Sequence, residues 1–135
     1  MVFLQSFLEL HTMKLTKRFR NFEKWALVTG AASGMGRIYV SRLAGMGYNV
    51  VAVDINAAGL EETTAIVRDQ ISTAEGLTES QKASFRMLQV VQDLSLNTAA
   101  DSIFARTEEE GCEIEVLVNN AGIMYCQAIH ATSER

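Results

Sequence analysis

Four short apolar runs are spread along the chain, and each contains mostly consecutive hydrophobic residues. Such runs are typical of parallel strands that are covered on both faces. Between the runs, hydrophobic residues recur every three or four positions, which predicts helices. The predicted strands span residues 25–28, 49–54, 85–92 and 114–118, and the predicted helices begin at Gly36, span 57–72 and run from Leu96 to Gly111.

This order of elements predicts an α/β fold built on a doubly wound parallel sheet. We expect the strand order 3-2-1-4, in which right-handed crossovers reverse direction between the first and fourth strands and leave a ligand crevice there. Asn56 is expected to cap the second helix, and Gly111 to end the third. The polar stretch over 72–84 predicts a loop or a frayed helical segment.

A glycine-rich turn joins the first predicted strand to the first helix, with Gly30, Gly34 and Gly36 where the chain reverses. Because glycine has no Cβ, the backbone can approach a diphosphate there, facing it with helix N–H groups and the positive end of the helix dipole. Asp54 ends the second strand 18 residues beyond Gly36, where a carboxylate accepts hydrogen bonds from an adenosine ribose. The alternative is a plain strand–helix–strand unit with a glycine-rich turn.

Polar residues also follow the third and fourth strands. Asp93 could contact an adenine ring or cap the next helix, and Ser95 could cap that helix in its place. The segment from Asn119 to Gly122 could bind neighbouring strand ends or a ribose, or could form an ordinary turn. The residues alone leave these alternatives open.

The composition argues against several classes of protein. The net charge is -4 and the body of the chain has no basic face, so we expect no nucleic-acid partner. Cys112 and Cys126 have no metal-binding or redox spacing, which indicates free thiols in a reducing compartment and therefore a cytoplasmic protein. His11 and His130 are isolated from other potential ligands, so we expect no metal site.

Residues 1–24 differ in composition from the predicted domain over 25–135. Hydrophobic residues recur at helical spacing up to Leu10, and a basic run follows them. This order of charge fits a secretory signal poorly, and the apolar part is too short to span a membrane. Two interpretations remain: an amphipathic helix at a membrane surface, or an extension without function whose natural start is Met13. We favour the second.

Taken together, the motifs over residues 25–135 resemble those of the short-chain dehydrogenase/reductase family. Its cofactor motif, Thr-Gly-x-x-x-Gly-x-Gly, matches Thr29 to Gly36, and its acid after the second strand matches Asp54. Its Asp-hydrophobic adenine contact matches Asp93-Leu94, and its Asn-Asn-Ala-Gly matches Asn119 to Gly122.

The resemblance implies a Rossmann fold and hydride transfer between a nicotinamide cofactor and a small alcohol or carbonyl substrate. For the full-length enzyme it also implies a homo-oligomer. The residues that it places against the cofactor are Gly30, Ser33, Gly34, Met35, Gly36, Asp54, Asp93, Leu94, Asn120, Ala121 and Gly122. NAD is expected over NADP, because a 2′-phosphate would bring like charge against Asp54. Ser33 and Ile55 are uncharged where NADP-preferring members often carry a basic residue.

The sequence departs from the family's pattern at the catalytic residues. In the family these are a serine and a Tyr-x-x-x-Lys helix, which follow the cofactor-binding motifs along the chain. The tyrosines here are each followed four residues later by an apolar residue: Leu43 after Tyr39, Ala52 after Tyr48 and Ile129 after Tyr125. We therefore expect the truncated, cofactor-binding half of an oxidoreductase, with no catalytic residues and no turnover. Other interpretations are a non-catalytic dinucleotide-binding module and an interaction scaffold. The apolar strand over 114–118 would make a poor sheet edge, so low solubility is expected.

Overall fold

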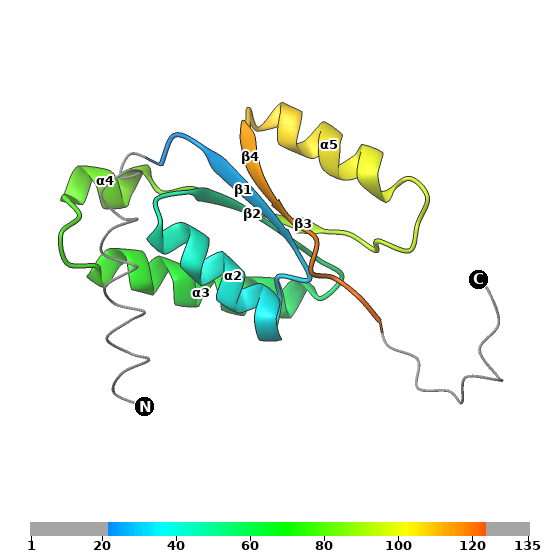
Figure 1. Cartoon of the computed structure of the whole chain (residues 1–135), viewed down its shortest axis with the longest axis horizontal. Helices are drawn as coiled ribbons and strands as arrows, with labels where there is room; N and C mark the ends of the chain where they lie inside the picture. Colours follow the sequence, from blue (N-terminus) through cyan, green and yellow to red (C-terminus); the bar gives the residue numbers. More distant parts are fainter. Residues whose placement is uncertain (1–21, 124–135) are drawn as a thin grey trace.

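A computed structural model of the chain describes residues 22–123, and its elements follow the predicted alternation. The strands are β1 (Trp25–Thr29), β2 (Asn49–Asp54), β3 (Met87–Val91) and β4 (Ile114–Val118). The helices are α2 (Gly34–Gly45), α3 (Ala57–Thr73), α4 (Glu79–Ser84) and α5 (Ala99–Glu109). All pairings are parallel and the order is β3-β2-β1-β4, which confirms the predicted fold and strand order (Figure 1).

Helices cover both faces of the sheet, as the right-handed crossover rule requires. The crossovers from β1 to β2 and from β2 to β3 place α2 and α3 on one face, and the reversed crossover from β3 to β4 places α5 on the other (Figure 1). Successive strand residues point to opposite faces. Ala26 and Val28 therefore pack toward α2 and α3, whereas Trp25 and Leu27 join the core beneath α5.

The helix α2 packs on the sheet through one face. Gly36, Val40, Leu43 and Ala44 are buried. Gly47 is also buried but lies beyond the end of the helix, with a φ of +95°. This left-handed conformation favours glycine and serves the tight turn into β2.

Capping residues set the ends of the other helices. Asn56 caps α3, as predicted, by accepting a 3.1 Å hydrogen bond from the Gly59 N–H. Gly111, with a φ of +64°, follows the last turn of α5, where its N–H binds the Glu108 carbonyl and the Cys112 N–H binds the Thr107 carbonyl. This pair of bonds is a Schellman motif, so the prediction that Gly111 ends the helix is confirmed.

Several boundaries differ from the predictions by one or two residues: α2 begins at Gly34 rather than Gly36, and β3 spans Met87–Val91 rather than 85–92. Of the two alternatives for the polar stretch over 72–84, the structure contains the helical one, the short helix α4, which the Thr78–Gln81 capping box starts. The helix α5 begins at Ala99 rather than Leu96, with Thr98 at the N-cap. Hydrophobic spacing placed Leu96 in the helix because this side chain faces the same apolar groove as the helical residues Ala100 and Phe104.

The strand β4 forms one edge of the described sheet and leaves apolar surface uncovered. Leu117 on this strand is 59% exposed, and Phe104 across the groove on α5 is also exposed. This exposure agrees with the prediction that residues 114–118 make a poor edge, and low solubility remains a prediction.

Part of the predicted extension lies outside the described residues, as do Cys126, His11 and His130. Within residues 22–123, no helix is both long enough and apolar enough to cross a bilayer.

Candidate functional site

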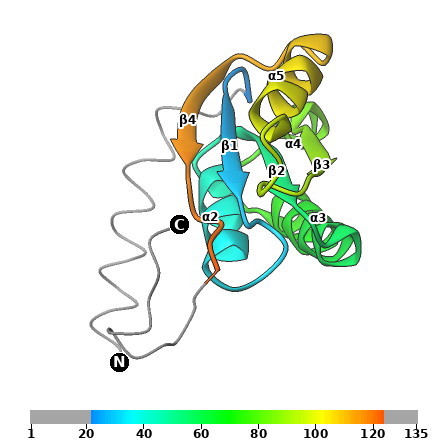
Figure 2. The same ribbon diagram turned by 90° about the vertical axis from the view of Figure 1, so that its right-hand side faces the viewer.

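The predicted site residues follow the carboxyl ends of four parallel strands, which meet at one edge of the sheet. Gly30 follows β1, Asp54 ends β2, Asp93 lies two residues after β3 and Asn120 lies two residues after β4. Figure 2 shows β1 and β4 pointing the same way, toward the loop that precedes α2. The crossover direction reverses between these two strands, which is where ligands bind in open α/β sheets.

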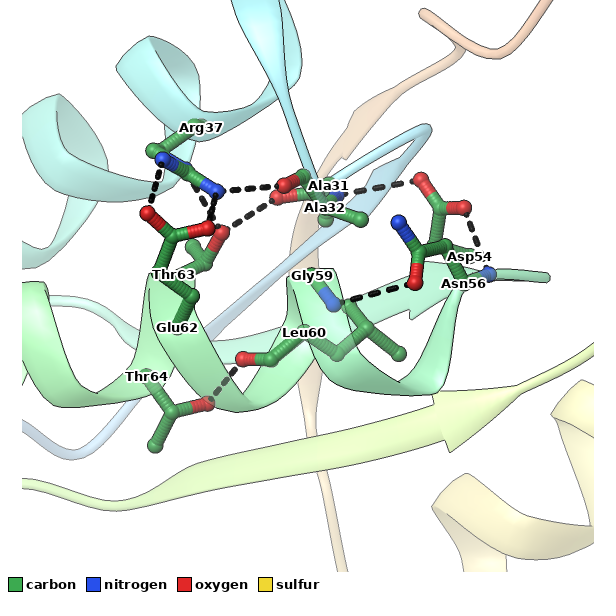
Figure 3. A network of polar contacts seen from close by, with 10 residues as sticks. All are labelled: Ala31, Ala32, Arg37, Asp54, Asn56, Gly59, Leu60, Glu62, Thr63 and Thr64. Carbon is green, nitrogen blue, oxygen red and sulfur yellow. Dashed lines mark hydrogen bonds and ion pairs between the residues drawn. The ribbon is translucent and has the colours of Figure 1, made fainter.

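Asp54 is held against the glycine turn by both of its carboxylate oxygens. Its Oδ2 accepts a 3.0 Å hydrogen bond from the Ala32 N–H, and its Oδ1 accepts a 2.9 Å hydrogen bond from the Asn56 N–H (Figure 3). Each carboxylate oxygen has two lone pairs, so acceptor capacity remains on both. The carboxylate is thereby fixed in orientation, half-buried, and able to accept hydrogen bonds from a bound hydroxyl.

The three glycines of the turn have different structural roles. Gly30 and Gly34 have φ values of +67° and +52°, a region that residues with a side chain rarely adopt. A Cβ on Gly36 would lie 1.8 Å from the Gly30 carbonyl oxygen, whereas a Cβ on Gly34 would meet nothing within 4 Å. Gly36 therefore allows α2 to approach β1, and Gly34 leaves the outer surface of the turn open.

Ser33, Gly34 and Met35 form the exposed start of α2. Ser33 is the N-cap residue, and its side chain makes no capping hydrogen bond. Met35 is 66% exposed. The first turn of a helix has N–H groups without intrahelical partners, and its dipole favours negative charge. An anionic group can therefore approach this segment without displacing a side-chain cap.

Asn120 links the ends of β1 and β4. Its side-chain amide donates to the Thr29 and Gly30 carbonyls at 3.2 and 3.3 Å, and its backbone N–H donates to the Thr29 hydroxyl at 3.1 Å. The Ala121 N–H donates to the same hydroxyl at 3.1 Å. The segment from Asn119 to Gly122 was predicted to bind a neighbouring strand end, to contact a ribose or to form an ordinary turn. The structure contains the first of these, the hydrogen bonds to the end of β1. Ala121 and Gly122 lie next to this link, and a contact to a ribose remains a prediction.

Asp93 closes a local turn and does not cap α5. Its Oδ1 accepts hydrogen bonds from the Ser95 hydroxyl at 2.7 Å and the Ser95 N–H at 2.9 Å. Thr98 is the N-cap residue, so the interpretation of Asp93 or Ser95 as the helix cap is wrong. The two side chains bond to each other within the turn, and they lie three (Ser95) and five (Asp93) residues before the N-cap residue, too early to reach the first N–H groups of the helix. Leu94 is exposed beside them, and an adenine contact remains a prediction.

We expect Ser95→Ala to raise the pKa of Asp93, because the Ser95 hydroxyl and N–H hold it below its usual range and only the N–H would remain. A folded-state pKa below the unfolded value, about 3.9, stabilises the fold above that pH. The stabilisation is lost as pH falls through the folded pKa, so the variant should lose less stability on acidification than the unmodified chain.

NMR titration of the Asp93 carboxyl measures the shift in its pKa. Ser102→Ala, on the exposed surface of α5, is the control, and an unchanged Asp93 pKa would contradict the prediction.

Arg37, which belongs to none of the sequence motifs, connects the glycine turn to α3. Its guanidinium donates to the Ala32 carbonyl, to the Thr63 hydroxyl and to both carboxylate oxygens of Glu62 (Figure 3). One signal was present in the sequence: a cation in the first turn of a helix is opposed by the helix dipole. An arginine at that position indicates a specific partner, but not which one.

The described residues contain no group of three or more side chains that could hold a metal ion. Cys112 is a free, buried thiol, and burial raises its pKa. Tyr48 precedes β2 at the opposite edge of the sheet, and burial raises the pKa of this side chain as well. Tyr39 lies on α2 and is partly exposed. We therefore assign no acid–base residue within 22–123.

Comparison with known proteins places this geometry in a wider group. The family model described as short chain dehydrogenase matches residues 24–135. A 2,3-dihydro-2,3-dihydroxybenzoate dehydrogenase from Bacillus subtilis is 32% identical over 82% of this chain and 38% of its own length. A 3beta-hydroxysteroid dehydrogenase from Mediterraneibacter gnavus is 39% identical over 76% of this chain and 32% of its own length.

Solved structures show the same arrangement. A citronellol catabolism dehydrogenase from Pseudomonas aeruginosa matches with a TM-score of 0.65 and 27% identity, covering 87% of this chain and 43% of that one. The L-sorbose reductase from Gluconobacter frateurii, complexed with NADPH and L-sorbose, matches with a TM-score of 0.67 over 82% of this chain and 38% of that one. At 22% identity the second match shows the fold alone. The chain spans about two fifths or less of the curated relatives it matches.

Proposed function

We propose, from the premise that this chain belongs to the short-chain dehydrogenase family, that it is the dinucleotide-binding part of an NAD(P)-dependent oxidoreductase. The observation that carries this proposal is the pairing of an open turn at Gly34 with a carboxylate, Asp54, bonded to the same turn. A diphosphate needs close backbone approach and N–H donors, and a ribose needs an acceptor beside them. The open turn and the Asp54 carboxylate lie next to each other, which supports the proposal.

Each part of the site has a proposed role in binding. The N–H groups at Ser33, Gly34 and Met35 hold the diphosphate at the start of α2. Asp54 accepts hydrogen bonds from the adenosine ribose, and Asp93-Leu94 contacts the adenine. Gly30 and Gly36 shape the turn, and Asn120 with its two following residues lines the cofactor between β1 and β4.

When bound, the nicotinamide group donates or accepts a hydride. The residues described here would bind and orient that cofactor but supply no positioned acid or base for the substrate oxygen. Proton transfer by such a group contributes about 10²–10⁴-fold to the rate. We therefore propose oxidation or reduction of an alcohol or carbonyl compound for the whole protein and no turnover for residues 1–135 alone. For the whole protein we further propose a cytoplasmic location, which the free thiol of Cys112 supports, and a homo-oligomer.

Titration of the chain with NADH tests the proposal directly. We expect saturable binding, followed by the change in nicotinamide fluorescence and reversed by excess NAD. Far-UV circular dichroism of the same sample confirms that the chain is folded. A folded chain without saturable binding would overturn the proposed function.

We expect the chain to bind NADH more tightly than NADPH, and Asp54→Asn to reduce this preference by about tenfold or more. A phosphate about 4 Å from a carboxylate at a protein surface costs up to about 4 kcal/mol per charge pair, and each 1.4 kcal/mol is tenfold in affinity. Asparagine keeps an acceptor for one of the two N–H groups that bind Asp54.

The measurement is the ratio of the two dissociation constants. Asp69→Asn removes the same charge from the exposed surface of α3 and is expected to leave the ratio unchanged. Tighter binding of NADPH by the unmodified chain would contradict the proposed cofactor preference.

A further inference from the structure

We infer that Arg37 is a positioning residue for the dinucleotide site, acting with Thr63 to set the direction of two successive peptide groups in the glycine turn. The expected effect of Arg37 on cofactor affinity rests on the proposed function. Its effect on the orientation of the turn rests on the hydrogen bonds of the turn alone.

One side chain of α2, Arg37, and one side chain of α3, Thr63, hold two successive carbonyls of the turn. The Arg37 Nη2 donates to the Ala32 carbonyl at 2.7 Å, and its Nε donates to the Thr63 hydroxyl at 3.0 Å. The Thr63 hydroxyl donates in turn to the Ala31 carbonyl at 3.1 Å. Thr63 is completely buried, so its hydroxyl is shielded from water. The side chain points at the turn (Figure 3).

Holding the carbonyls also sets the N–H groups. Among residues 22–123 every peptide bond is trans, and in a trans peptide the carbonyl and the following N–H point in opposite directions. With the Ala31 carbonyl bound to Thr63, the Ala32 N–H points away from α3 and reaches Asp54 at 3.0 Å. With the Ala32 carbonyl bound to Arg37, the Ser33 N–H points to the opposite side, at the exposed start of α2. The hydrogen bonds of Arg37 and Thr63 thus orient both Asp54, the proposed ribose acceptor, and the Ser33 N–H, a proposed diphosphate donor.

Glu62 explains why a cation is tolerated in the first turn of α2. Its carboxylate accepts from Arg37 at 3.2 and 2.8 Å, which neutralises the charge that the helix dipole opposes. A guanidinium has five N–H donors in a fixed fork, and Arg37 uses them for four hydrogen bonds to protein groups. Arg37 is therefore occupied as a structural donor and is not a direct ligand of a phosphate.

The test uses Arg37→Met, which keeps an unbranched side chain and removes the donors, and Arg37→Lys, which restores the charge without the fork. Arg42→Met removes the same charge from the exposed last turn of α2 and is the matched control. Thr63→Val removes the hydroxyl while keeping the side-chain shape, and decides the question if Arg37→Met fails to fold.

The first measurement is amide hydrogen exchange by NMR without ligand. We expect the Ala32 amide to exchange at least about tenfold faster in Arg37→Met and Thr63→Val, relative to the amides of β1, and as in the unmodified chain in Arg42→Met. Unchanged protection of Ala32 in both variants would overturn the inference. This result does not depend on cofactor binding, so it stands even where the chain fails to bind NADH and the proposed function fails.

The second measurement is the affinity for NADH and for NADPH. We expect Arg37→Met to bind NADH about tenfold more weakly and to lose part of its preference over NADPH, because the Ala32 N–H is no longer held against Asp54 and only the Asn56 N–H still orients the carboxylate. Arg37→Lys should not restore either property. Recovery of NADH affinity in Arg37→Lys without recovery of Ala32 protection would show that the positive charge attracts the diphosphate, and would overturn the positioning role.

Discussion

Gly36→Ala is expected to destabilise the chain by more than about 3 kcal/mol, although alanine is the better helix former by about 1 kcal/mol. A Cβ at this position would lie 1.8 Å from the Gly30 carbonyl oxygen, 2.6 Å from its carbon and 2.9 Å from the Asn120 side-chain nitrogen. Two of these atoms belong to the backbone, so no rotamer change relieves the contact. The helix would have to move away from β1, which opens the core at Val40.

Urea denaturation followed by circular dichroism measures this effect. Gly45→Ala in the same helix is the matched control, because its Cβ would meet only the end of the Gln70 side chain at 3.3 Å. We expect this variant to be as stable as the unmodified chain or slightly more stable. A Gly36→Ala protein with unchanged stability would show that α2 and β1 are not as closely packed as described.

Gly34→Val is expected to weaken NADH binding by about 100-fold or more while the fold remains. A Cβ here would meet no protein atom within 4 Å, so the added branches would occupy the space proposed for the diphosphate. The φ of +52° also imposes a backbone cost of about 1–2 kcal/mol on any residue with a side chain. Loss of binding must therefore be separated from loss of stability.

Gly111→Val makes that separation. Its φ of +64° imposes the same kind of strain, and a Cβ there also meets nothing within 4 Å, but it lies after α5 at the amino end of β4. We expect both variants to lose similar stability and only Gly34→Val to lose NADH affinity. Equal NADH affinity in Gly34→Val and the unmodified chain would mean that the turn does not hold a phosphate.

Much of the fold could be predicted because its signals act over a few residues. Apolar runs and helical spacing located the strands and α2, and Asn56 and Gly111 act on N–H and carbonyl groups within one turn of themselves. The start of α5 could not be predicted in this way. Leu96 is apolar because it faces the groove beside α5, and hydrophobic spacing alone does not separate that position from a helical one.

The candidate site also contains features that local sequence predicts and features that only tertiary packing decides. The glycine turn and Asp54 at the end of β2 were determined by the sequence, because strand–turn–helix order brings them to one edge of a parallel sheet. Only the tertiary structure decided that Gly36 packs while Gly34 stays open, and that Arg37 contacts Glu62, which lies 25 positions further along the chain. These contacts depend on how closely α2 approaches β1 and α3, a distance set by the packing of whole side chains and recorded in no local pattern of residues.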